Sequence, residues 1–107
     1  MSRFADVLAR LAATIEARKG GDPAASYTAK LLGDPSLAAK KMGEEAIEAV
    51  IAATQADKPA LAAESADLIY HWLVVLAAAG VSIDDVAARL EAREGTSGLA
   101  EKASRKS

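Results

Sequence analysis

The chain has 107 residues, of which 51% are hydrophobic and only 4% aromatic, so we expect a single domain, residues 1–107, around a modest aliphatic core. The net charge of −2 disfavours a surface that binds nucleic acid. The absence of cysteine excludes disulfides, zinc–thiolate sites and thiol nucleophiles. The start of the chain lacks the apolar core of a signal peptide, and the most apolar run, residues 68–79, is too short to span a bilayer. We therefore expect a cytoplasmic protein with no membrane partner.

The sequence predicts five helices, at about residues 3–19, 27–32, 36–55, 58–79 and 83–94. Ser36 is the expected N-cap of the third helix and Asp57 that of the fourth, while Ser82 with Asp85 resembles a capping box. No strand alternation is present. The predicted fold class is all-α, a helical bundle of four main helices and one short helix, followed by a polar tail at about residues 96–107.

The fourth predicted helix is apolar around most of its circumference, which is typical of a helix at the centre of a bundle. The other helices of so short a chain cover it poorly, so we expect a homodimer to complete the bundle. The expected buried side of the third helix consists of Leu37, Ile47, Val50, Ile51 and Thr54.

Acidic residues gather on the third and fourth predicted helices. Glu45 and Glu48 are three residues apart on one helix, and Glu64 and Asp67 are three apart on the other, so each pair shares a face. A tight turn joins the helices, so they should run antiparallel. Counted outward from that turn, Glu48 faces Glu64 and Glu45 faces Asp67. The same count places Lys41 opposite His71.

Four converging carboxylates need a neutralising partner, because burying like charges together costs on the order of several kcal/mol. Ligands that are all oxygen favour Mg²⁺, with Mn²⁺ as a possible substitute, over zinc. A solvated acidic face is the simpler interpretation for the third helix alone. It suits the fourth helix poorly, because Glu64 and Asp67 are nearly the only charges on an apolar helix.

The pattern Glu44-Glu45-x-x-Glu48 followed by Glu64-x-x-Asp67 resembles the signature of the MazG-like all-α nucleoside triphosphate pyrophosphohydrolases. Within that superfamily, the chain is most similar to the phosphoribosyl-ATP pyrophosphohydrolases of histidine biosynthesis. This narrower resemblance rests on the segments 26–31, 40–46, 66–71 and 97–105. It implies Mg-dependent hydrolysis of phosphoribosyl-ATP to phosphoribosyl-AMP and pyrophosphate, with the metal bound by Glu45, Glu48, Glu64 and Asp67.

Other residues are weaker candidates. Glu44 is the candidate catalytic residue for orienting or deprotonating water, and a carboxylate without that role fits its position equally well. The candidate substrate-binding residues are Lys30, Lys41, Tyr27, Thr28 and His71. Simpler interpretations are a solvated helix face for the lysines, a helix cap for Thr28, and a core histidine bonded to a carboxylate for His71.

Two alternative functions stay open at this point. The first is a house-cleaning pyrophosphohydrolase of the same superfamily that acts on another nucleoside triphosphate. The second is a non-catalytic helical dimerisation module, which would bind no divalent ion. The carboxylates on the apolar fourth helix count against this second alternative.

Overall fold

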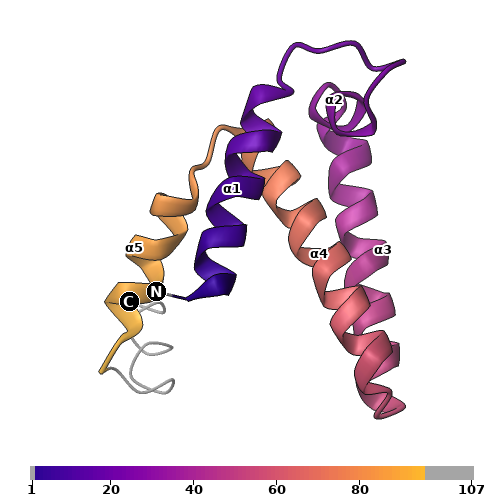
Figure 1. Cartoon of the computed structure of the whole chain (residues 1–107), viewed down its shortest axis with the longest axis vertical. Coiled ribbons are helices and arrows are strands. Elements are labelled where there is room, and N and C mark those ends of the chain that lie inside the picture. Colours follow the sequence, from indigo (N-terminus) through magenta and orange to yellow (C-terminus); the bar gives the residue numbers. More distant parts are fainter. Residues whose placement is uncertain (1, 96–107) are drawn as a thin grey trace, which may run out of the picture.

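The computed structural model describes residues 2–95 and is all-helical over that range. It contains the five predicted helices, which confirms the fold class (Figure 1). Their bounds are α1 Arg3–Ala17, α2 Tyr27–Leu32, α3 Pro35–Thr54, α4 Lys58–Ala79 and α5 Ile83–Arg93. The predicted polar tail lies outside the described residues.

Each helix begins after a Ser or Asp whose side chain accepts a backbone N–H, which satisfies one of the free donors of the first turn. Asp57 and the Ser82–Asp85 capping box act as predicted. The prediction for α3 was wrong, because its cap is Asp34 and not Ser36. The helix starts at Pro35, whose fixed φ and missing N–H suit the first helical position.

Helices α3 and α4 form an antiparallel hairpin, which is the most extensive helix–helix contact in the structure (Figure 1). Ala56, in the turn between them, has φ +55°, a left-handed conformation that L-residues other than Asn and Asp rarely adopt. At the other end of α4, Gly80 ends the helix with φ +74°. The predicted hairpin is therefore present.

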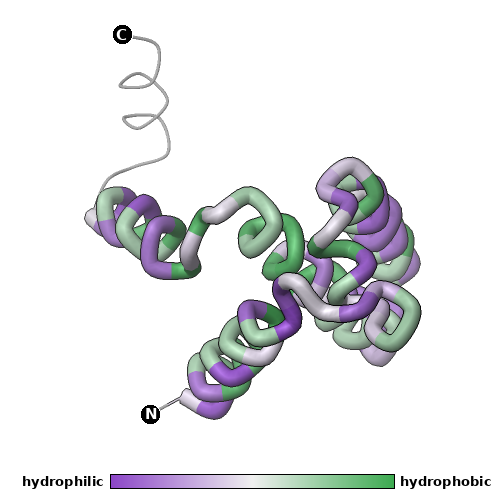
Figure 2. Tube along the Cα trace, turned by 90° about the horizontal axis from the view of Figure 1, so that it is seen from above, coloured by the Kyte–Doolittle hydropathy of each residue, from purple (hydrophilic) through white to green (hydrophobic). Residues whose placement is uncertain are grey.

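The core lies at the end of the hairpin far from its turn. It consists of fully buried side chains from four helices: Ile15, Leu31, Ala38, Leu73 and Val74. From this end α1 and α5 project in different directions, as Figure 2 shows from above. The core therefore holds α1 and α2 against the C-terminal half of α4.

The buried side predicted for α3 was wrong over most of its length. Leu37 packs against the core, but Ile47, Val50 and Ile51 are 62%, 60% and 44% exposed. Thr54 is exposed as well. Within the described residues, a single chain supplies no helix to cover this face of α3.

The whole of α4 is long and apolar enough to cross a membrane, by length and composition alone. This differs from the sequence prediction, which considered only its C-terminal run. The central helix of a bundle has the same apolar character. In the structure α4 contacts α1, α2 and α3 and contributes Leu73 and Val74 to the core, although only 17% of its apolar window is buried in the single chain.

Candidate active site

Three carboxylates converge midway along the α3–α4 hairpin. One oxygen each from Glu45, Glu64 and Asp67 lies within 4.8 Å of the other two. Glu45 comes from α3, and the other two come from successive turns of α4. Glu45 and Glu64 are partly buried, while Asp67 is exposed. This acidic trio is a set of hard oxygen ligands open on one side, an arrangement suited to a divalent cation that also contacts a substrate.

Glu48, the fourth predicted ligand, lies outside the acidic trio. It is exposed on α3, one turn closer to the hairpin turn than Glu45. Its charge nevertheless acts on the site, since it is among the groups that raise the pKa of Glu64. The structure thus brings three of the four predicted carboxylates together and places the fourth beside them.

The electrostatics of the trio centre on Glu64. Partial burial, the negative charges of Glu45, Asp67 and Glu48, and a hydrogen bond with Glu45 all raise the pKa of Glu64 above its ordinary value. The negative charges around Glu64 therefore disfavour its ionised form in the folded protein.

Glu44, the predicted catalytic residue, points to a different partner. Its Oε1 lies 3.3 Å from Nζ of Lys41, one turn earlier on α3. Both side chains are partly exposed. Lys41 is therefore paired along its own helix, and the two residues form a charged pair beside the trio.

Two hydrogen bonds join α2 to α4. Tyr27 Oη lies 3.3 Å from His71 Nε2, and the hydroxyls of Thr28 and Tyr70 bond to each other. Ser26 is the N-cap of α2, so Thr28 does not have the capping role considered for it. Consecutive residues of α2 thus bond to consecutive residues of α4.

His71 occupies the core position predicted for it and is only 8% exposed. The prediction that a carboxylate would be its hydrogen-bond partner was wrong. Nδ1 lies 2.7 Å from the backbone carbonyl of Asp67, and the other ring nitrogen faces Tyr27. Sequence reasoning missed Tyr70, although its position next to His71 was the available signal. Lys30 is exposed in the last turn of α2.

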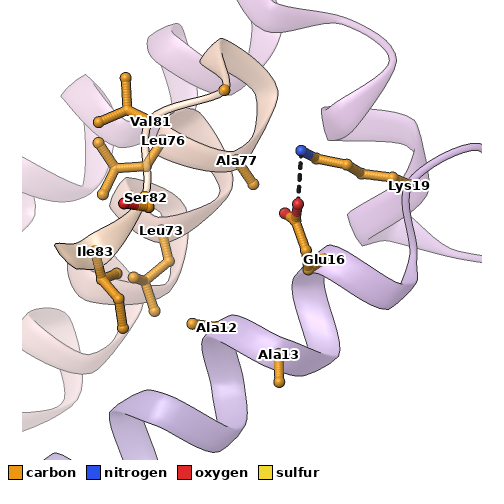
Figure 3. A pocket seen from close by; sticks show the side chains of 11 residues that line it. Ala12, Ala13, Glu16, Lys19, Leu73, Leu76, Ala77, Val81, Ser82 and Ile83 are labelled. Carbon is orange, nitrogen blue, oxygen red and sulfur yellow. Dashed lines mark hydrogen bonds and ion pairs between the residues drawn. The ribbon is translucent and has the colours of Figure 1, made fainter. Parts of the chain in front are cut away.

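A pocket of about 410 Å³ lies elsewhere, between α1, the end of α4 and the start of α5 (Figure 3). Its walls are mainly apolar, with Leu73 and Ile83 among them, and the ion pair of Glu16 and Lys19 at 2.9 Å stands at its edge. It shares no residue with the acidic trio. The pocket is therefore separate from the predicted chemistry.

Comparison with known proteins identifies the family of the chain. A family model described as phosphoribosyl-ATP pyrophosphohydrolase matches residues 8–94. The chain belongs to this family. A protein of Caulobacter vibrioides named phosphoribosyl-ATP pyrophosphatase is 75% identical over 103 residues, which cover 96% of each chain. A protein with the same name from Caulobacter sp. (strain K31) is 70% identical over the full length of both chains. Another from Cereibacter sphaeroides is 61% identical over 92% of this chain and 97% of its own.

The span that matches the phosphoribosyl-ATP pyrophosphohydrolase family includes the acidic trio, Glu44, Glu48 and the bonded residues of α2 and α4. It ends before the tail segment 97–105, on which part of the resemblance had rested. The family membership predicted from the resemblance of these segments is therefore confirmed.

Proposed function

We propose that this chain hydrolyses phosphoribosyl-ATP to phosphoribosyl-AMP and pyrophosphate in histidine biosynthesis. The observation that carries the proposal is the convergence of three carboxylate oxygens within 4.8 Å in a chain of the phosphoribosyl-ATP pyrophosphohydrolase family. Hydrolysis of a phosphoanhydride depends on charge neutralisation and a positioned water more than on a covalent nucleophile. A set of acidic ligands beside a solvent-exposed face supports this chemistry.

Glu45, Glu64 and Asp67 would hold the Mg²⁺ ion, for which Mn²⁺ can substitute, and Glu48 is the fourth proposed ligand. When bound, the ion neutralises phosphate charge and lowers the pKa of a coordinated water. Support comes from the donor set, since carboxylate oxygens suit Mg²⁺. The raised pKa of Glu64 also fits, because it indicates that the folded trio lacks a positive charge.

The chain's other residues would position the reactants. Glu44 orients or deprotonates the attacking water, and its bond with Lys41 at 3.3 Å restricts its carboxylate. Lys30 and Lys41 attract phosphate groups as point charges. Tyr27, Thr28 and His71 shape the nucleotide side, where α2 is bonded to α4.

We further propose that the chain works as a single-domain homodimer in the cytoplasm. Ile47, Val50 and Ile51 leave one face of α3 apolar and exposed. Exposed apolar surface on neighbouring turns of one helix is typical of an interaction site. A second copy packed on this face would complete the bundle around the hairpin.

A pyrophosphate-release assay on phosphoribosyl-ATP, with Mg²⁺ and with EDTA, tests the function. We expect turnover that requires the cation and is lost in the Glu64→Gln variant. Faster release from ordinary deoxynucleoside triphosphates would instead support a house-cleaning pyrophosphohydrolase. No release from any nucleotide, together with no Mg²⁺ binding by calorimetry, would support a non-catalytic dimerisation module.

A further inference from the structure

His71 is the chain's single histidine, and its two bonds determine where its proton lies. Nδ1 is 2.7 Å from the carbonyl oxygen of Asp67, and a carbonyl oxygen can only accept a hydrogen bond. Nδ1 therefore carries the hydrogen. In the neutral ring Nε2 is then an acceptor, so the hydroxyl of Tyr27, 3.3 Å away, donates to it.

These two hydrogen bonds restrict which further hydrogen bonds the phenol group of Tyr27 can make. A phenol has one hydrogen, and in Tyr27 that hydrogen is used by His71. The oxygen can still accept hydrogen bonds, and Tyr27 is 50% exposed while His71 is buried. Tyr27 is therefore a half-exposed residue whose phenol oxygen can accept a hydrogen bond but cannot also donate one.

An acceptor of this kind distinguishes the two parts of a nucleotide. Ionised phosphate oxygens carry no hydrogen, so their lone pairs would face those of the phenol oxygen. Ribose hydroxyls and the exocyclic amino group of adenine carry hydrogens that they can donate. The geometry thus favours the nucleoside part of a ligand at Tyr27.

The neighbouring contacts hold this acceptor in place near the acidic trio. The rings of Tyr70 and His71 meet edge to face with centroids 4.9 Å apart, and Tyr70 bonds to Thr28 in the same short helix as Tyr27. His71 follows Asp67 by one helical turn, and the Nδ1 bond closes that turn. Tyr27 is therefore tied to the part of α4 that carries Asp67.

We propose that Tyr27 determines specificity by accepting a hydrogen bond from a donor on the nucleoside, either a ribose hydroxyl or the adenine amino group. In this proposal His71 is a positioning residue, which sets the direction of the Tyr27 hydroxyl through its Nδ1–H form. The proposal rests on the proposed function, because it requires a nucleotide to lie beside the trio.

Binding calorimetry with AMP and with pyrophosphate, both with Mg²⁺, separates the two ends of the substrate. We expect Tyr27→Phe to weaken AMP binding about 5- to 10-fold, the scale of one neutral hydrogen bond, and to leave pyrophosphate affinity within about twofold of wild type. If the donor is the 2′-hydroxyl, wild type and Tyr27→Phe should bind 2′-deoxy-AMP with equal affinity. If the donor is the amino group, they should bind purine riboside monophosphate with equal affinity. Equal weakening of pyrophosphate, unchanged AMP affinity, or no AMP binding by the wild type would overturn the proposal.

Variants of His71 test the positioning role. His71→Asn keeps a donor for the Asp67 carbonyl but has no acceptor at the Nε2 position, so it should weaken AMP as Tyr27→Phe does. His71→Gln, whose amide oxygen reaches that position, should restore the affinity. The Tyr27→Phe/His71→Asn double variant should bind AMP no more weakly than either single variant, because both changes remove one interaction. Additive losses would contradict the proposed coupling.

Tyr70→Phe is the matched control, because it removes a hydroxyl bond between the same two helices. It should lower the melting temperature and weaken AMP binding less than Tyr27→Phe does, because it loosens the contact between α2 and α4 without removing the acceptor on Tyr27. If Tyr70→Phe weakened AMP binding as much as Tyr27→Phe does, the hydroxyl of Tyr27 would act only by holding α2 against α4. That result would overturn the proposal.

Nitrogen-15 NMR at pH 8, where a free imidazole is neutral, gives a direct readout from the single histidine. We expect the Nδ1–H form, and the Nε2–H form would overturn the proposal by freeing the Tyr27 hydrogen. Failure of the wild type to hydrolyse phosphoribosyl-ATP would instead reject the proposed function. An active Tyr27→Phe variant with wild-type AMP affinity would reject this inference alone.

Discussion

The two halves of the α3–α4 hairpin are built differently. Far from the turn, Ala38, Leu73 and Val74 are buried against α1 and α2. Toward the turn, Ile47 and Val50 are about 60% exposed, and the acidic trio stands between the two halves. The first half therefore supplies the stability of the single chain, while the second carries groups that this chain alone does not bury or neutralise.

This difference has a cost in free energy. Apolar surface contributes about 25 cal/mol per Å² only when it is removed from water, so the exposed face of α3 contributes little in one chain. Converging carboxylates repel one another unless a proton or cation intervenes. Groups that oppose stability in the isolated chain are best explained by function, and the proposed cation and second copy would supply the partners that these groups lack. The four predictions that follow test this contrast.

Removal of a trio carboxylate should have the largest effect. Glu64→Gln should lower the rate of phosphoribosyl-ATP hydrolysis by at least about 100-fold, the scale of losing a group that directly stabilises the transition state. Glu48→Gln, which removes the fourth proposed ligand beside the trio, should lower it less, by about 10- to 100-fold. Steady-state rates at saturating Mg²⁺ check both. A larger loss for Glu48 than for Glu64 would show that the active metal site differs from the trio.

A charge on the exposed face of α3 should break the proposed homodimer. Val50→Glu would bury an unpaired carboxylate between two copies, which should weaken dimer affinity by about 100-fold or more. The molar mass measured by light scattering at about 5 μM should therefore fall from twice 11.0 kDa toward 11.0 kDa. Leu90→Glu on α5, where Leu90 is 58% exposed, is the matched control and should leave the dimer intact. The opposite result would move the interface from α3 to α5.

Without metal, the stability of the protein should depend on the pH through Glu64. Its pKa is raised above the ordinary value of 4.5, so the folded state favours the protonated carboxyl. This contribution is fully present below the unfolded value and is lost as the pH rises through the folded value. In EDTA at pH 7.5, Glu64→Gln should therefore melt above the wild type.

Mg²⁺ completes the same test. It should raise the melting temperature of the wild type by mass action and that of Glu64→Gln much less. Calorimetric scans between pH 4 and pH 8, with and without the cation, give both comparisons. A variant that melts below the wild type in EDTA would show that Glu64 makes a stabilising contact instead.

The smallest effect is expected at the turn. Ala56 has φ +55°, so Ala56→Gly should stabilise the protein by at most about 1 kcal/mol and leave activity unchanged. Gly80→Ala is the reverse change at φ +74°, where an added Cβ meets nothing within 4 Å, and it should destabilise by about 1 kcal/mol. Denaturant unfolding measures both. A destabilising Ala56→Gly would indicate that the Ala56 side chain packs against a second copy.

Much of the fold could be predicted because its signals are local. A cap acts on backbone groups within one turn, and the spacing of apolar residues reports a helix face directly. Asp57, Ser82 and Asp85 act as predicted. Where two local signals competed, as with Asp34 and Ser36 before α3, Pro35 decided the start of the helix.

The candidate site was partly predictable for the same reason. Helical spacing and an antiparallel turn were enough to bring Glu45 together with Glu64 and Asp67. The carboxylate pattern indicated the superfamily, and the four sequence segments indicated the family that the match confirms. Spacing could not show that Glu48 lies apart, because that depends on how the two helices approach and on the orientation of individual side chains.

Contacts between distant residues were decided by packing alone. The bonds from Tyr27 to His71 and from Thr28 to Tyr70 join residues 44 and 42 positions apart, and neither has a periodic signal. The exposure of Ile47 and Val50 is likewise invisible in a pattern that marks a face as apolar without saying what covers it. Periodicity identifies which side chains share a face, whereas their partners depend on the three-dimensional arrangement of all five helices.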